Sequence, residues 1–326
     1  MADKGLLQYK VGALMYVPAL NAGIGEKIRA GSFPDVDSIA FCLEDSLNEQ
    51  GVKEGEGQLA KTLAYIAGRP AAGGLPLLFV RVRGCSQFRR LPEFLGDAAK
   101  LLTGVVFPKF DLSNAAAYCA IAGKINAERD APLYIMPILE SRAVMGLDSR
   151  RSVLLGLREL LDGCKDYVLN IRVGAMDFCK SFGLRRSIGD TVYDLGVVRD
   201  VLTDVLTVFS DAYVVSAPVW EYYGGGGGGG GDMRWAVGLE NELRLDVANG
   251  FVGKTVIHPS QAPLVRKWLK PARIDVEDAK AVLDWKDEKL GVARSVGGNR
   301  MNELATHRRW AQKILALSQI YGVRDG

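Results

Sequence analysis

Two carboxylates that follow apolar runs are the residues best suited to chemistry in this sequence. Glu140 comes directly after the run 133–139, and Asp177 comes four residues after the run 167–173. Mg²⁺ binds oxygen ligands and uses one or two protein carboxylates, keeping its other positions for water and substrate oxygens. The alternative is that each acidic residue stabilises the N-terminus of a following helix.

Basic and acidic residues follow other apolar runs in the same way. Arg81 lies near the end of the run 76–82, where its guanidinium would point either into a barrel mouth or outward against helices. Its planar fork suits a substrate carboxylate or a developing enolate. Glu44 and Asp45 follow the run 38–43, and Lys109 follows the run 104–108.

The elements that must position these residues are short apolar runs separated by segments with helical periodicity. This alternation is typical of βα units around a parallel sheet. About eight runs are present, the number that a (β/α)₈ TIM barrel needs, and the carboxyl ends of barrel strands converge on one face. The predicted strands are residues 13–18, 38–43, 76–82, 104–108, 133–139, 167–173, 212–217 and 253–257.

We therefore predict an α/β protein with a TIM-barrel catalytic domain at residues 1–270. Residues 271–326 should form a C-terminal helical extension, with helices at 276–289 and from 302 to about 320, packed on the barrel or on a neighbouring subunit. Gly224–Gly231 is a run of glycines, which we expect to be a mobile loop over the active-site face.

Composition excludes several classes of protein. The chain has 326 residues and a formal charge of +3, without the clustered Lys/Arg stripe of nucleic-acid-binding proteins. It lacks a membrane-spanning apolar run and a signal peptide, so we expect a cytoplasmic protein with neither nucleic acid nor membrane as a partner. The five cysteines are scattered, which favours reduced thiols.

Other polar residues admit two interpretations. His258 ends the last predicted strand and would be either a proton carrier or a structural residue, whereas His307 lies on a predicted helix where packing is the default. Lys180, Arg185 and Arg186 would either bind a phosphate group or form a solvated loop.

Six short segments, taken in order, resemble the citrate lyase β-subunit-like (HpcH/HpaI aldolase) family. The resemblance runs from residue 13 to residue 261. Its segments are 16–18 (Tyr-Val-Pro), 43–46 (Leu-Glu-Asp-Ser), 77–84, 104–109, 138–140 and 250–259.

The resemblance implies a fold, a metal and a set of site residues. Members are TIM barrels that assemble into trimers or hexamers, use Mg²⁺, and cleave 2-oxo acids or acyl-CoA thioesters. On this basis the metal ligands are Glu140 and Asp177, and the catalytic residues are Arg81, Asp45 and Glu44. The predicted substrate-binding residues are Arg81, Lys109, Ala175 and Met176.

The leading hypothesis is a Mg²⁺-dependent carbon–carbon lyase or aldolase acting on a small 2-oxo or hydroxy carboxylic acid or its coenzyme A thioester. The alternatives are enolate chemistry on a phosphoenolpyruvate-like molecule at the same site, and a barrel that binds a ligand without turnover. Two departures from the family pattern argue against assuming that coenzyme A binds. Arg83 stands where Asn is usual, and the glycine run replaces ordinary loop sequence.

Overall fold

A computed structural model describes residues 4–68, 73–224, 233–286 and 289–325 of the chain. The glycine run that we predicted to cover the active-site face lies, apart from Gly224, outside these residues.

Eight parallel strands form one sheet in the order β7-β6-β5-β4-β3-β2-β1-β8. Backbone hydrogen bonds also join β7 to β8, from the Ala217 N–H to the Gly253 carbonyl at 3.0 Å and from the Val252 N–H to the Val215 carbonyl at 2.9 Å, so the barrel closes. Each strand falls within a run predicted from the sequence, which confirms the TIM barrel. The strands are β1 (Ala13–Pro18), β2 (Ser38–Cys42), β3 (Leu77–Arg81), β4 (Gly104–Phe107), β5 (Tyr134–Leu139), β6 (Ile171–Val173), β7 (Val215–Ser216) and β8 (Lys254–Val256).

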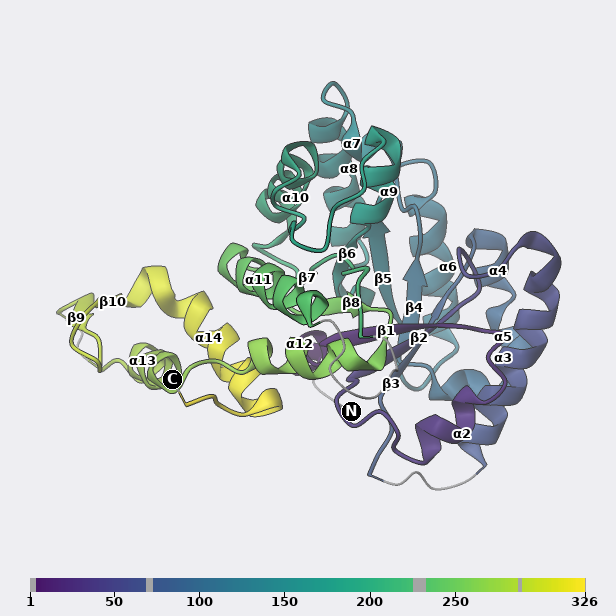
Figure 1. Cartoon of the computed structure of the whole chain (residues 1–326), viewed down its shortest axis with the longest axis horizontal. Coiled ribbons are helices and arrows are strands. Elements are labelled where there is room, and N and C mark those ends of the chain that lie inside the picture. The colour runs from purple at the N-terminus through teal and green to yellow at the C-terminus, as the bar shows by residue number, and fades with distance from the viewer. Residues whose placement is uncertain (1–3, 69–72, 225–232, 287–288, 326) are drawn as a thin grey trace.

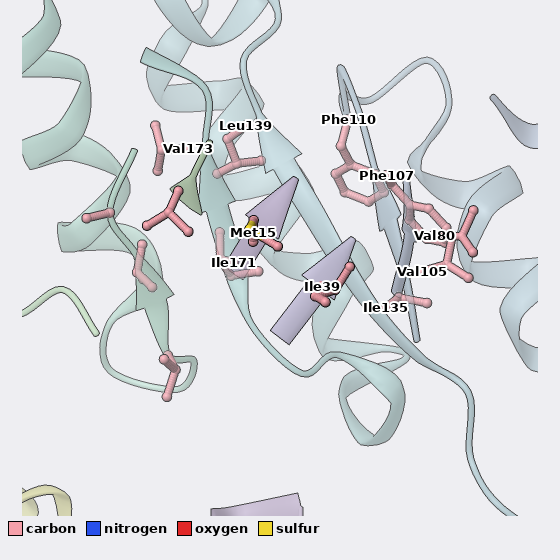
Figure 2. Packing of buried hydrophobic residues seen from close by; sticks show 14 of the residues in the cluster. Met15, Ile39, Val80, Val105, Phe107, Phe110, Ile135, Leu139, Ile171 and Val173 are labelled. Atoms are coloured by element: carbon pink, nitrogen blue, oxygen red, sulfur yellow. The ribbon is translucent and has the colours of Figure 1, made fainter. Parts of the chain in front are cut away.

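Successive strand residues divide between two hydrophobic layers, because side chains alternate between the faces of a strand. Ile39 and Phe41 belong to the larger layer between the sheet and the helices, whereas Ala40 belongs to a small cluster inside the barrel. Figure 2 shows part of the outer layer, where Val105 and Phe107 of β4 lie beside Val80 of β3. Every second position of a strand is therefore available to the barrel interior.

Helices surround the strands (Figure 1). Leu7 of α1 packs in the inner cluster. The helices are α1 (Lys4–Lys10), α2 (Ile24–Arg29), α3 (Val52–Ala67), α4 (Cys85–Arg89), α5 (Leu91–Leu95), α6 (Ala115–Ala127), α7 (Arg142–Met145), α8 (Arg150–Asp162), α9 (Ala175–Phe182), α10 (Gly196–Phe209), α11 (Arg234–Asn249) and α12 (Ala262–Leu269), with short 3₁₀ turns η1 (Glu49–Gly51), η2 (Gly96–Leu101), η3 (Lys165–Tyr167) and η4 (Pro259–Gln261).

Buried ion pairs attach α11 to the last strand. The ammonium group of Lys254 lies 2.7 Å from Glu242 Oε1 and 2.8 Å from Asp246 Oδ2, and all three side chains are buried. Arg186 pairs with Glu242 from the loop after α9. A buried charge is tolerated when it is paired in this way, so this cluster is structural.

The C-terminal segment projects from one side of the barrel (Figure 1). It contains α13 (Arg273–Leu283), a hairpin of β9 (Val292–Arg294) and β10 (Met301–Glu303), and α14 (Leu304–Tyr321). Both helices were predicted, although α13 ends earlier than expected, and the hairpin was not predicted. The division at residue 270 stays a prediction.

Among the described residues, none of the helices combines the length and apolar composition needed to span a bilayer. All five cysteines are free thiols.

Candidate active site

A cavity of about 180 Å³ opens at the carboxyl ends of the strands. Catalytic residues of TIM barrels gather on this face. The cavity is lined by Tyr16, Asp45, Arg81, Ile138, Glu140, Arg172, Val173, Gly174, Met176, Asp177, Val219, Thr255 and Ile257.

Arg81 points into the barrel mouth, which settles the choice between inward and outward orientations. One guanidinium nitrogen, Nη2, lies 2.8 Å from Glu44 Oε2, 3.0 Å from Asp45 Oδ2 and 3.3 Å from Glu140 Oε1. The guanidinium also lies 5.5 Å from the centre of the Tyr16 ring. Carboxylates from the ends of β2 and β5 thus converge on one arginine from the end of β3.

Lys109 joins this group through an unusual backbone conformation. Its φ angle is +47°, in the left-handed region that non-glycine residues rarely adopt and that is common at functional sites. In this conformation its N–H donates to Glu140 Oε1 at 2.9 Å while its ammonium group pairs with Glu44. The Glu44 pairing raises the pKa of Lys109 against the opposing effect of burial. The lysine is therefore a cation held against Glu44, Asp45 and Glu140, although it is not among the residues that line the cavity.

Glu140 carries the clearest electrostatic perturbation. Burial, with the nearby Asp177 and Glu44 carboxylates, raises the pKa of Glu140 to about 7 although Arg81 opposes the change. Like charges that raise a carboxylate pKa in this way favour binding of a cation between them. Gly174 leaves the required room, because a Cβ there would lie 2.1 Å from Glu140 Oε2.

The helix-capping alternative applies to only one of the two carboxylates. Glu140 Oε1 accepts hydrogen bonds from the Lys109 N–H and from Arg81. The helix that follows has Ser141 at its N-cap, so Glu140 is not a cap. Asp177 lies in the first turn of α9, where a negative charge is favourable to the helix dipole. Asp177 also lines the cavity, so both roles are open to it.

The described residues contain no group of three or more His, Cys, Asp or Glu side chains that is able to hold a metal ion. Two cavity-lining carboxylates, Glu140 and Asp177, are nevertheless the protein ligand set that Mg²⁺ commonly uses. The residues present therefore fit a magnesium ion that takes its remaining ligands from water and substrate.

Three residues inside the barrel were not predicted as site residues: Tyr16, Arg172 and Thr255. Arg172 is buried, and its Nη2 donates to Thr255 Oγ1 at 2.6 Å. Burial lowers the pKa of Arg172 and raises the pKa of Tyr16, which keeps the phenol neutral. The sequence shows only that Arg172 faces the opposite side of the strand from Ile171 and Val173. The structure places those two neighbours in the outer layer, so Arg172 faces the interior.

The other residues predicted to bind substrate differ in position. Met176 is half-exposed and lines the cavity. Ala175 is buried in the outer hydrophobic layer, so a role in substrate binding would fall to its backbone N–H. Arg83, the departure from the family pattern, donates to the backbone carbonyls of Glu44 and Leu47 at 3.3 and 3.0 Å and thereby holds the Glu44 loop.

The two histidines have local structural contacts. His258 Nδ1 lies 2.8 Å from Ser260 Oγ in a capping box at η4, and its ring stacks on Tyr223. His307 Nδ1 accepts from the Glu303 N–H at 2.8 Å in the C-terminal extension.

The basic cluster after Asp177 does not converge on a common point. Arg186 is buried and paired with Glu221 and Glu242, whereas Lys180 and Arg185 are exposed. This arrangement argues against a phosphate site. The solvated-loop interpretation holds for Lys180 and Arg185, whereas Arg186 is a buried structural residue.

Solved structures with the same fold are distant in sequence. CitE from Mycobacterium tuberculosis, described in complex with magnesium, acetoacetate and coenzyme A, is 21% identical, with 94% of this chain and 98% of that chain covered and a TM-score of 0.62. A citrate lyase from Burkholderia xenovorans LB400 is 16% identical, with coverages of 97% and 94% and a TM-score of 0.70. RipC from Yersinia pestis is 14% identical, with coverages of 82% and 99% and a TM-score of 0.56.

No curated protein matches the chain by sequence. A family model does: it is described as a C–C bond lyase of the TIM-barrel fold, and it matches residues 5–323. Since this match covers nearly the whole chain, the protein belongs to the TIM-barrel C–C bond lyase family.

Proposed function

We propose that the protein is a Mg²⁺-dependent lyase or aldolase that makes or breaks a carbon–carbon bond next to a carboxylate. The observation that carries the proposal is the convergence of Arg81 with Glu44, Asp45 and Glu140 at a cavity that Asp177 also lines. The substrate would be a small 2-oxo or hydroxy carboxylic acid, free or as a coenzyme A thioester.

Glu140 and Asp177 would hold the metal ion. Glu140 Oε1 is already occupied by Arg81 and the Lys109 N–H, which leaves Oε2, on the Gly174 side, for a cation. When bound, Mg²⁺ would polarise a substrate carbonyl as a Lewis acid.

The residues of the chain itself would stabilise and orient the reacting groups. Arg81 is fixed by three carboxylates, so its positive charge is held in place before negative charge develops on an enolate oxygen. Lys109 holds Glu44 and Asp45 on the other side of this group. Tyr16 stays neutral and is available as a hydrogen-bond donor.

Cavity size and the structural neighbours support a small acid. The cavity of about 180 Å³ is below the range of roughly 300–1,000 Å³ of sites for drug-sized ligands. The Mycobacterium tuberculosis structures are described with magnesium and with oxaloacetate, pyruvate, acetoacetate or coenzyme A. A nucleotide portion of a thioester would therefore have to lie outside the cavity.

Calorimetric titration of Mg²⁺ in the presence of pyruvate or oxaloacetate tests the proposal. Wild-type protein should bind Mg²⁺ more tightly with the oxo acid present. Glu140→Gln and Asp177→Asn should each weaken metal binding at least about tenfold, as loss of a charged ligand does.

Glu159→Gln is the matched control, because Glu159 is exposed on α8. Screening thioesters and phosphoenolpyruvate with the same proteins would separate lyase activity from enolate chemistry on a phosphorylated acid. A wild-type protein that binds no Mg²⁺ under any of these conditions would refute the proposal.

A further inference from the structure

Arg172 is a buried cation whose contacts do not neutralise it. Its side chain faces the barrel interior from β6 and is 1% exposed. Nη2 donates to Thr255 Oγ1 at 2.6 Å and Nη1 to Asn170 Oδ1 at 3.5 Å, and Nε has no hydrogen-bond partner. None of the ion pairs between described residues includes Arg172.

Burial of the unpaired Arg172 guanidinium destabilises the folded chain, and an anion from outside the chain would offset this. An arginine stays protonated in proteins, so it cannot escape the cost of burial by losing its proton. A buried charge without a partner destabilises the folded chain. Arg81, in the same cavity, differs because three carboxylates surround it. Arg172 is thus the cavity cation that still lacks an anion.

The position of Arg172 relative to the proposed metal site limits what the anion is. Arg172 pairs in the sheet with Ile138 of β5, two residues before Glu140, which directly follows that strand. At about 3.3 Å per strand residue, this places the Arg172 backbone about 6–7 Å deeper along the barrel than the Glu140 backbone. One small molecule with two anionic ends, separated by a few carbon atoms, would reach both places.

We infer that Arg172, with Thr255 beside it, binds a second carboxylate of the substrate and selects dicarboxylic acids over monocarboxylic ones. The inference rests on the proposed function for the placement of the first carboxylate at the metal. Arg172 is then a specificity-determining residue, while Glu140, Asp177 and Arg81 serve the reacting end.

Equilibrium binding to the full-length protein tests this without any turnover. We would measure oxaloacetate against pyruvate with Mg²⁺ present, and succinate against propionate without it. Wild type should prefer the dicarboxylate of each pair. Arg172→Met should weaken dicarboxylate binding on the order of tenfold to a hundredfold, as expected for loss of a buried charged hydrogen bond, and leave monocarboxylate binding unchanged.

Two further variants separate selectivity from folding. Arg172→Lys restores a charge and should recover part of the preference, and Arg151→Met removes an exposed arginine on α8 and should change nothing. Without ligand, Arg172→Met should melt no lower than wild type, because an uncompensated buried charge has been removed.

The outcomes also separate this inference from the proposed function. If Glu140→Gln has no effect on Mg²⁺ but succinate binding still depends on Arg172, the metal proposal fails and the carboxylate subsite stands. If wild type shows no preference for dicarboxylates, or Arg172→Met keeps the preference while melting lower, Arg172 is a structural residue and the inference is overturned.

Discussion

Arg81 and Arg172 both lie on the inside of the barrel, yet their surroundings favour different roles in the proposed site. Arg81 is held by Glu44, Asp45 and Glu140, so its charge is fixed and largely balanced. Arg172 has only neutral hydrogen-bond partners. The pair illustrates that a functional role is set by the neighbours that compensate a charge, and not by the charge itself.

Gly174 offers a test of how closely the metal-binding carboxylate is fitted. In Gly174→Ala the new methyl group would lie 2.1 Å from Glu140 Oε2, so Glu140 must turn away from its place. We expect Mg²⁺ affinity measured by calorimetry to fall at least about tenfold, since ligand displacement on this scale is comparable to losing a supporting contact.

Gly123→Ala is the matched control for that substitution. Gly123 lies within α6, and a Cβ there would meet no atom within 4 Å. The control should leave Mg²⁺ binding unchanged and should raise the free energy of unfolding by about 0.5–1 kcal/mol. Normal metal binding by Gly174→Ala would mean that Glu140 is not a ligand in the position described.

At the scale of elements, the strands were predictable and much of their interior was not. Apolar β-rich runs located all eight strands, because doubly covered strands are almost continuously apolar. The same logic placed Glu44, Glu140 and Asp177 at strand ends. Arg172 and Thr255 lie within strands and were not predicted in this way. Which side of a strand faces the barrel interior depends on its register with the neighbouring strands.

The hairpin of β9 and β10 was missed for a different physical reason. Its first strand, Val292–Arg294, is exposed at every position, so no alternation of buried and exposed residues marks it in the sequence. What holds the turn is a long-range contact, in which buried Asp278 of α13 accepts hydrogen bonds from the Val296 N–H at 2.7 Å and Asn302 Nδ2 at 3.0 Å. Local sequence periodicity does not predict contacts between residues about twenty positions apart.

Asp37 connects several elements at the end of the barrel opposite the cavity. It precedes β2, accepts from the Ala13 N–H of β1 at 2.9 Å and lies 3.4 Å from Arg266 of α12. Burial raises the pKa of Asp37 to about 6 from an ordinary value of 3.8, although the Ala13 hydrogen bond and Arg266 oppose it. The amino-terminal end of a barrel serves stability, so this carboxyl should affect folding rather than catalysis.

The stability contributed by Asp37 should therefore fall as pH rises. Between pH 4 and pH 6 the unfolded chain loses the Asp37 proton before the folded chain does, so ionisation favours unfolding by about 1–3 kcal/mol. Asp37→Asn should lack this decrease and should be more stable than wild type at pH 7 by about 1 kcal/mol. Urea unfolding of both proteins at pH 4, 5, 6 and 7 measures the difference.

Asp130→Asn provides the comparison for that series, because Asp130 is exposed. Its stability should follow wild type at every pH. A difference between Asp37→Asn and wild type that does not change with pH would show that Asp37 ionises normally in the folded protein.

At the scale of the whole molecule, the C-terminal extension has a small core of its own. Val276, Ala279 and Val282 of α13 pack with Ala311 and Ile314 of α14, apart from the barrel layers. The last turns of α14 belong to the barrel instead, through Leu317 and Tyr321. One long helix thus joins two packing units, which supports our proposed division near residue 270.

Assembly into a homotrimer or hexamer, with the extension against a neighbouring subunit, stays a proposal that light scattering would test.

Asp278 is the residue through which this division is best tested. It is buried and accepts from Val296, Asn302 and Arg300, so Asp278→Ala leaves donors of the hairpin without their acceptor. Loss of such a buried charged partner costs about 2–3 kcal/mol. If residues 271–326 open as a separate unit, that cost should fall on them alone, because local unfolding follows cooperative units. Hydrogen exchange should then speed up at residues 292–303 and stay unchanged in β1 to β8.

Asp275→Ala, which removes the exposed contact with Arg300 at 2.7 Å, is the milder control. Exchange that speeds up equally in the barrel strands would mean that extension and barrel unfold together, and the proposed boundary would be wrong.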